Sequence, residues 1–162
     1  MYLKRKIDER LSSFHGLRFP FSKPIQSTHR YEVVVGVGGN IDDVRKRFEH
    51  LFIYFKRDKR VELFQTSLIL KNPPFGYANQ DDFFNSIMFF KTSMQPQKFL
   101  QYLLRVEKHF RRKRSFSNAP RTLDLDIIFF DNRVIKTKDL VVPHPHWYKR
   151  ESVVIPLAGA KI

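Results

Sequence analysis

The chain has 162 residues, of which 42% are hydrophobic, 15% aromatic and 28% charged. This mixture is typical of a globular protein and excludes a wholly disordered chain, a collagen and a coiled coil. The absence of cysteine excludes disulfides, a thiolate nucleophile and cysteine-ligated metal centres, and it agrees with an expected cytoplasmic location. No apolar run approaches the ~18 residues that a membrane-spanning helix needs, so we expect no membrane partner.

The charge is strongly unbalanced. The 30 Lys and Arg residues outnumber the 16 Asp and Glu residues and give a formal net charge of +14. Such a field attracts nucleic acid, an anionic membrane surface or a polyphosphate such as a nucleotide, and charge alone does not choose among them. A nucleic-acid-binding module is therefore the alternative to an enzyme, and it predicts an affinity that falls steeply with salt.

Residues 1–30 are expected to form a basic N-terminal extension, followed by a single domain over residues 31–162. The extension has only weak apolar periodicity, which is compatible with a short helix and an arm packed on the domain. Leu17, Phe19 and Phe21 alternate and suggest an edge strand.

The domain itself shows alternating strand and helix patterns. In chain order we expect a strand over 31–35, a glycine-rich turn over 36–40 and a helix over 41–55 with Asn40 as its N-cap. A strand over 61–70, a loop over 71–82, a strand over 83–92 and a helix from Pro96 to Phe110 follow. A charged, mobile segment over 111–118 then leads to a strand over 121–130. The order strand, helix, strand, strand, helix, strand predicts an α+β fold. We expect a ferredoxin-like sandwich, in which helices pack on a mainly antiparallel sheet.

An acidic pair, Asp124 and Asp126, stands in the last of these strands. Because alternate side chains of a strand share a face, the two carboxylates point one way, and the apolar residues point the other way: Leu123, Leu125, Ile127 and Phe129. Neighbouring carboxylates on one face repel each other, and Mg²⁺ relieves this repulsion while also binding substrate phosphate oxygens. The alternative is a solvent-facing strand whose two acids have no special role.

Basic residues flank the acidic pair. Arg111, Arg112 and Arg114 precede the strand and Arg121 begins it. Guanidinium groups match phosphate oxygens bidentately, so the acids and arginines together predict a site for a metal ion and a polyphosphate. Any single arginine here is also explained as a solvated group that complements a helix dipole.

Six short motifs carry a family resemblance. They are Val-Gly-Gly-Asn at 37–40, Asn-Pro-Pro-Phe-Gly at 72–76, Phe-Phe-Asn at 83–85, Val-Glu at 106–107, Ala-Pro-Arg-Thr-Leu-Asp-Leu-Asp at 119–126 and Val-Pro-His at 142–144. From residue 31 to about residue 157, the chain resembles the 6-hydroxymethyl-7,8-dihydropterin pyrophosphokinases of folate biosynthesis. The resemblance implies transfer of the β,γ-diphosphate of Mg-ATP to the pterin hydroxymethyl group with release of AMP. It also implies two Mg²⁺ ions, ATP as co-substrate and no specific nucleic-acid partner, and we expect a monomer. With ATP as co-substrate, we expect the segment over 111–118 to act as a lid that closes over the site when ATP binds.

The resemblance implies a role for each matching residue. Asp124 and Asp126 correspond to the Mg²⁺ ligands, and Arg112 and Arg121 to catalytic arginines that bind the β and γ phosphates. The other ATP-binding positions are Arg114, Ile127, His144 and Arg150. The pterin-binding positions are Asn72, Pro73, Pro74, Phe75, the stacking ring Phe83 and the amide Asn85, while Glu107 matches an acid that is structural or supports the site.

The chain departs from the family pattern at several positions. Ser152 stands where an aromatic residue normally closes the second face of the pterin, and we consider Phe116 and Trp147 as candidates for the missing ring. The other departures are Gly39 for Ser, Asn72 for Thr, Arg111 for Gly and Asp139 for a basic residue. We expect these changes to affect affinity more than the class of reaction.

Overall fold

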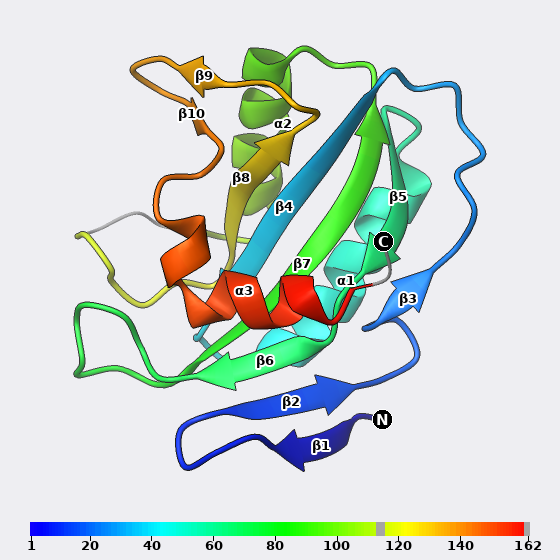
Figure 1. Ribbon diagram of the computed structural model, residues 1–162. Coiled ribbons are helices and arrows are strands. Elements are labelled where there is room, and N and C mark those ends of the chain that lie inside the picture. Colours follow the sequence, from blue (N-terminus) through cyan, green and yellow to red (C-terminus); the bar gives the residue numbers. More distant parts are fainter. Residues whose placement is uncertain (113–115, 161–162) are drawn as a thin grey trace.

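The computed structural model describes residues 1–112 and 116–160 (Figure 1). The expected ATP-binding residue Arg114 lies outside the described residues, as do the other central residues of the expected lid. No helix in the described part of the chain has both the length and the apolar character needed to cross a membrane.

The domain is built on an antiparallel sheet. Its main elements are β4 (Tyr31–Gly39), α1 (Val44–Arg57), β5 (Val61–Thr66), β6 (Ile69–Asn72), β7 (Phe83–Thr92), α2 (Pro96–His109) and β8 (Asp124–Phe130). The strands are ordered β6-β7-β4-β8, β5 also pairs with β7, and all these pairings are antiparallel. The predicted ferredoxin-like α+β fold is therefore confirmed.

Helices cover both faces of this sheet. The amphipathic helices α1 and α2 pack on one face, where Phe48, Phe55 and Phe99 are fully buried in the main core. A third helix, α3 (Glu151–Ala158), lies across the other face, in front of the strands in Figure 1. It contributes Val153 to a smaller apolar cluster with Ile87 and Ile128. The sequence pattern did not predict α3, because the segment is apolar on most sides and contains Pro156.

The structure corrects the predicted start of α1. The helix begins at Val44, and the side chain of Asp43 caps it by accepting a hydrogen bond from the Lys46 N–H at 3.1 Å. Asn40 is not the N-cap. A turn with Asp42 at φ 60° separates Asn40 from the helix, which leaves the Asn40 side chain free to bind elsewhere.

A β-bulge changes the alternation of side chains along β8. Val34 pairs with Phe129 and Val35 with Ile127, so Ile128 is an extra residue in the ladder. Beyond the bulge, Phe130 enters the main core and Phe129 packs against the cluster on the α3 side. The prediction that Phe129 shares the face of Leu123 is therefore wrong. Before the bulge, the alternation holds as predicted.

The N-terminal segment adds strands to the sheet. The elements are β1 (Leu3–Lys6), β2 (Ser12–His15) and β3 (Phe21–Ser22). Strand β2 pairs with β6, and β3 pairs with β5. No helix occurs within residues 1–30, all of which the structure describes, and the suggested edge strand is confined to Phe21 and Ser22.

The remaining elements follow β8. A small hairpin of β9 (Ile135–Lys136) and β10 (Val141–Val142) leads to a 3-10 turn, η1 (Trp147–Lys149), and then to α3. The predicted single strand over 61–70 is divided into β5 and β6. Ser67 lies at the break, where its hydroxyl accepts a hydrogen bond from the Ile87 N–H at 2.8 Å.

Candidate functional site

The site is organised by a row of residues across three neighbouring strands. Gly38 of β4 pairs with Asn85 of β7 on one side and with Asp124 of β8 on the other. Adjacent strands lie about 4.8 Å apart, so the amide and the carboxylate flank a position without a side chain. A Cβ atom at Gly38 would stand 2.5 Å from Asn85 Oδ1. A side chain here would therefore displace the Asn85 amide, whereas glycine leaves the space above the sheet open.

Two adjoining cavities lie along this row. The larger, of about 320 Å³, is lined by Arg10, Asn72, Pro73, Pro74, Phe75, Phe83, Asn85, Asn118, Arg121, Asp124, Lys149, Arg150, Glu151 and Ser152. The smaller, of about 60 Å³, is lined by residues that include Gly36, Gly38, Asp124, Asp126, His144 and Arg150. They share Asn85, Asp124, Arg150 and Ser152. The sheet thus brings most of the expected pterin and nucleotide residues to one face.

The two carboxylates of the acidic pair have opposite electrostatic environments. Asp124 accepts hydrogen bonds from Arg112 Nη1 at 2.8 Å and from Arg121 Nη1 at 3.1 Å. Burial alone would raise the pKa of Asp124, but the two guanidinium groups lower it below its usual value. For Asp126, burial, the negative charge of Asp124 and that of Glu107 raise the pKa to about 7.

These surroundings fit a divalent cation. Asp126 makes no side-chain hydrogen bond or ion pair within 1–112 and 116–160, and its negative charge is disfavoured there. A cation beside both carboxylates would offset their repulsion. The described residues contain no cluster of three or more His, Cys, Asp or Glu side chains suited to a metal. The other ligands would then be phosphate oxygens and water, as is usual for Mg²⁺.

Arg112 is held in place by groups from α2 and from the beginning of β8. Its Nη1 also donates to the Leu123 carbonyl oxygen at 3.2 Å and lies 3.4 Å from Glu107 Oε2. Glu107 is only 2% exposed, and the same Oε2 accepts the Leu125 N–H at 2.8 Å. Arg112 Nε is buried without a hydrogen-bond partner. Glu107 therefore joins α2 to β8 and contacts the arginine.

Asn40 has a different role from the one predicted. Its Oδ1 accepts the Arg121 N–H at 2.9 Å, and its Nδ2 donates to Gln80 Oε1 at 2.8 Å. Gln80 in turn donates to the Asn118 carbonyl oxygen at 2.8 Å. Asn40 therefore connects the loop after β6 with the segment that leads into β8, so that Arg121 is fixed relative to both.

All six expected pterin residues line the larger cavity. Asn85 Nδ2 donates to Asn72 Oδ1 at 2.7 Å, so the two amides orient each other. The Arg121 guanidinium lies 5.4 Å from the centre of the Phe83 ring. Phe75 is 70% exposed on its loop, with the Arg150 guanidinium 5.5 Å from its ring centre. This end of the site combines flat apolar surface with amide groups.

The expected nucleotide residues are brought together only in part. His144 and Arg150 line the smaller cavity. Burial, together with the positive charge of Arg150, lowers the pKa of His144, whose Nδ1 is buried without a partner. The Ile127 side chain is buried in the core beneath the helices, on the face opposite the acidic pair. A ligand in the cavities can reach only the main chain of Ile127.

Neither candidate for the missing ring lines a cavity of the site. Trp147 packs edge-on against Phe129, with 5.1 Å between the ring centres. Phe116 packs against Tyr77 at 5.3 Å. In contrast, Arg10 from the N-terminal segment and Glu151 at the start of α3 both line the larger cavity. Sequence reasoning missed these two residues because neither belongs to a recognisable motif.

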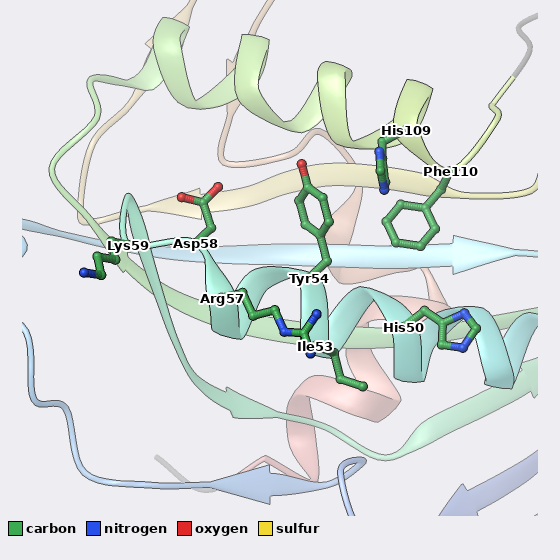
Figure 2. Close-up of a pocket in the computed structure, with 8 residues that line it drawn as sticks. All are labelled: His50, Ile53, Tyr54, Arg57, Asp58, Lys59, His109 and Phe110. Carbon is green, nitrogen blue, oxygen red and sulfur yellow. The ribbon is translucent and has the colours of Figure 1, made fainter.

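Another hollow, of about 610 Å³, lies between α1 and α2 (Figure 2). It is lined by His50, Ile53, Tyr54, Arg57, Asp58, Lys59, His109 and Phe110. Asp58, the one carboxylate among them, already accepts hydrogen bonds from Arg60 and from the Tyr102 hydroxyl. This hollow therefore offers no acidic pair, and the acidic pair on β8 remains the better candidate for chemistry.

Comparison with known proteins identifies similar chains. The family model described as 7,8-dihydro-6-hydroxymethylpterin-pyrophosphokinase (HPPK) matches residues 34–161. A Helicobacter pylori protein named 2-amino-4-hydroxy-6-hydroxymethyldihydropteridine pyrophosphokinase is 40% identical over 144 residues, which cover 88% of this chain and 87% of that protein. A Campylobacter jejuni protein of the same name is 41% identical over 86% of this chain and 88% of that protein. An Aquifex aeolicus protein of the same name is 36% identical over 77% of this chain and 77% of that protein.

Proposed function

Because the chain belongs to the 7,8-dihydro-6-hydroxymethylpterin-pyrophosphokinase family, we propose that its adjoining cavities hold the two substrates of that reaction side by side. The chain is a pyrophosphokinase of folate biosynthesis, which transfers pyrophosphate to hydroxymethyldihydropterin. ATP is the pyrophosphate donor. The proposal concerns which residues of this chain bind each substrate and how they promote the transfer.

The dihydropterin occupies the larger cavity. Its flat ring lies against Phe83, and its polar edge meets the amides of Asn72 and Asn85. The hydrogen bond of 2.7 Å between these two amides fixes their orientation before the substrate binds. Pro73, Pro74 and Phe75 form the side of the cavity that belongs to the loop after β6. Two aromatic rings, two prolines and a pair of oriented amides within an otherwise polar cavity suit a small heteroaromatic substrate with a polar edge.

The ATP phosphates lie along the acidic pair. Asp124 and Asp126 would hold Mg²⁺, two ions in our proposal, which supplies positive charge to the phosphate oxygens during phosphoryl transfer. His144 and Arg150 border the smaller cavity and bind the nucleotide there. Arg114 and the main chain of Ile127 complete the proposed nucleotide contacts. Burial and the negative charge of Asp124 raise the pKa of Asp126, and a bound cation would favour its ionised form.

The reaction joins the two cavities. The pterin hydroxymethyl oxygen attacks the β-phosphorus of ATP, the bond from that phosphorus to the oxygen of the α-phosphate breaks, AMP leaves, and the hydroxyl proton passes to solvent. Arg112 and Arg121 contact Asp124 in the absence of substrate, and they turn to the β and γ phosphates when ATP is bound. Alignment and charge neutralisation then account for most of the rate increase.

One observation carries this placement: Asn85, Gly38 and Asp124 are paired directly across three adjacent strands. The pterin edge and the phosphates are thereby held within one strand spacing of the empty position at Gly38. The attacking oxygen and the phosphorus atom can then meet above Gly38, between the two anchoring residues, at the ~3–3.5 Å that the reaction requires. A single row of the sheet therefore aligns both substrates.

The test is AMP release from ATP and Mg²⁺ with and without 6-hydroxymethyl-7,8-dihydropterin. We expect Asp124→Asn and Asp126→Asn to reduce pterin-dependent AMP release by about 100-fold or more. Asp131→Asn is the matched control, because Asp131 lies just beyond the far end of β8 and lines neither cavity. Wild-type turnover in either site variant, with circular dichroism showing a folded chain, would refute the assignment of the acidic pair.

A further inference from the structure

We propose that Arg10, from the N-terminal segment, binds the dihydropterin: its planar guanidinium group closes the face of the ring that lies opposite Phe83. The inference rests on the proposed placement of the pterin in the larger cavity. It adds a residue that lies outside the part of the chain matched by the family model, which begins at residue 34.

Arg10 reaches this cavity because of how the N-terminal hairpin is placed. Strand β2 pairs with β6, whose last residue, Asn72, is itself a cavity residue. In Figure 1, the turn between β1 and β2, the loop after β6 and the start of α3 lie on the same side of the molecule. Arg10, Phe75 and Ser152 come from these three segments and line one cavity.

The backbone of the turn is well anchored. Asp8 Oδ1 accepts hydrogen bonds from the Arg10 N–H at 2.7 Å and from the Leu11 N–H at 2.9 Å. The Leu11 side chain is buried, at 4% exposure. At the other end of the side chain, Arg10 Nη2 donates to Glu151 Oε1 at 3.0 Å. A fixed backbone and one carboxylate partner direct the guanidinium to the start of α3.

The cavity lacks a second ring on that side. Ser152, next to Glu151, has no flat surface, and neither Phe116 nor Trp147 lines the cavity. Phe75 is the other aromatic residue among the lining residues, and its ring already faces the Arg150 guanidinium at 5.5 Å. A position for a planar group therefore remains beside the start of α3.

A guanidinium group meets the chemical requirement of this position. It is flat and delocalised, it is weakly hydrated for a cation, and it stacks on aromatic faces. Half of the Arg10 side chain is exposed, 56% by area, so it can adjust to a substrate without a large loss of buried contacts. Lysine carries the same charge but has no plane, which gives a way to separate stacking from simple attraction.

The placement predicts an effect on pterin binding but not on the transfer step. Arg10 lines the larger cavity but not the smaller one, where Asp126 lies. A residue that binds the ring before and during the reaction changes KM and leaves kcat almost unaltered. Glu151 acts through Arg10 as a positioning residue, since its carboxylate holds the guanidinium.

The experiment compares Arg10→Ala, Arg10→Lys and the control Arg5→Ala, whose side chain is exposed on the neighbouring strand β1. For Arg10→Ala we expect a rise of about 10-fold in the KM for pterin, with kcat and the KM for ATP within twofold of wild type. Arg10→Lys is expected to resemble Arg10→Ala. Wild-type KM values in Arg10→Ala, or in Arg10→Lys, would overturn the proposal.

Two further measurements make the result independent of turnover. Calorimetric titration of pterin into each variant, with Mg²⁺ and a non-hydrolysable ATP analogue, is expected to show the same loss of affinity. Weaker pterin binding in Arg10→Ala would support a role of Arg10 in pterin binding even if the wild-type protein released no AMP. Absence of AMP release from wild type would refute only the proposed function. Glu151→Gln is expected to raise the KM in wild type but not in the Arg10→Ala background. Additive effects of the two substitutions would contradict the role of Glu151.

Discussion

Glu107 allows a quantitative test of how the site is supported. The substitution Glu107→Ala removes a carboxylate that is 2% exposed, lies 3.4 Å from Arg112 Nη1 and accepts the Leu125 N–H at 2.8 Å. Alanine leaves that buried N–H without a partner, which costs about 1–3 kcal/mol. It also removes one of the carboxylates beside a largely buried guanidinium, and loss of one member of a buried ion pair costs about 3–5 kcal/mol.

The two effects overlap, because Arg112 keeps its 2.8 Å contact with Asp124. We therefore expect Glu107→Ala to lower the free energy of unfolding by about 3–5 kcal/mol, out of the ~5–15 kcal/mol that is usual for a domain. For a chain of this length, such a change corresponds to a fall in Tm of roughly 10–15 °C.

Urea unfolding followed by circular dichroism measures this difference, and thermal unfolding gives the Tm. Glu107→Gln is the matched control, because its amide oxygen can still accept the Leu125 N–H, and we expect a loss of about half that of alanine. A loss below about 1 kcal/mol for Glu107→Ala would refute the reasoning, since it would mean that the carboxylate is not needed by the groups around it.

Three other predictions follow from the geometry. Burial would raise the pKa of Glu62, but hydrogen bonds that include one from Lys23 lower it to about 2. Glu62 therefore stabilises the fold above about pH 4.5, and this contribution is lost as the pH falls from 4.5 to 2. Glu62→Gln is expected to flatten that part of the curve of unfolding free energy against pH. In Gly38→Ala the new Cβ would stand 2.5 Å from Asn85 Oδ1, so steady-state kinetics should show a higher KM for pterin. Mg²⁺ with a non-hydrolysable ATP analogue should raise the Tm of wild type but not of Asp126→Asn.

Each of these three predictions can be contradicted by one measured outcome. An unchanged pH profile in Glu62→Gln would show that its carboxylate is not specially stabilised in the folded state. A wild-type KM in Gly38→Ala would show that the amide of Asn85 does not need the space above the glycine. An equal rise in Tm for Asp126→Asn would place the cation elsewhere.

The regular part of the fold was predictable from the sequence, because it depends on local periodicity. The alternation of side chains correctly put Asp124 and Asp126 on one face of β8, and helical spacing with Pro96 at its start predicted α2. The pattern failed where the backbone departs from regularity. The bulge at Ile128 moved Phe129 to the opposite face, and single-residue alternation contains no signal for such an insertion.

The parts of the site that could not be predicted depend on contacts between distant residues. Asn40 has the local character of an N-cap, but its Oδ1 binds the N–H of Arg121, 81 residues further along the chain. Arg10 has no motif around it, and only the pairing of β2 with β6 brings it to the cavity. Capping preferences describe a residue and its immediate neighbours, whereas both of these roles are set by sheet topology.

The N-terminal hairpin also determines which strand forms one edge of the sheet, opposite the edge formed by β8. Without it, β6 would present its unpaired backbone groups beside Ile69 and Leu70, both apolar and normally buried. An open apolar edge of this kind invites pairing with strands of other chains and hence aggregation. With the hairpin present, the outermost strand is β1, whose residues Leu3–Lys6 are all exposed and include three consecutive basic side chains. Their mutual repulsion between molecules discourages edge-to-edge association at high protein concentration.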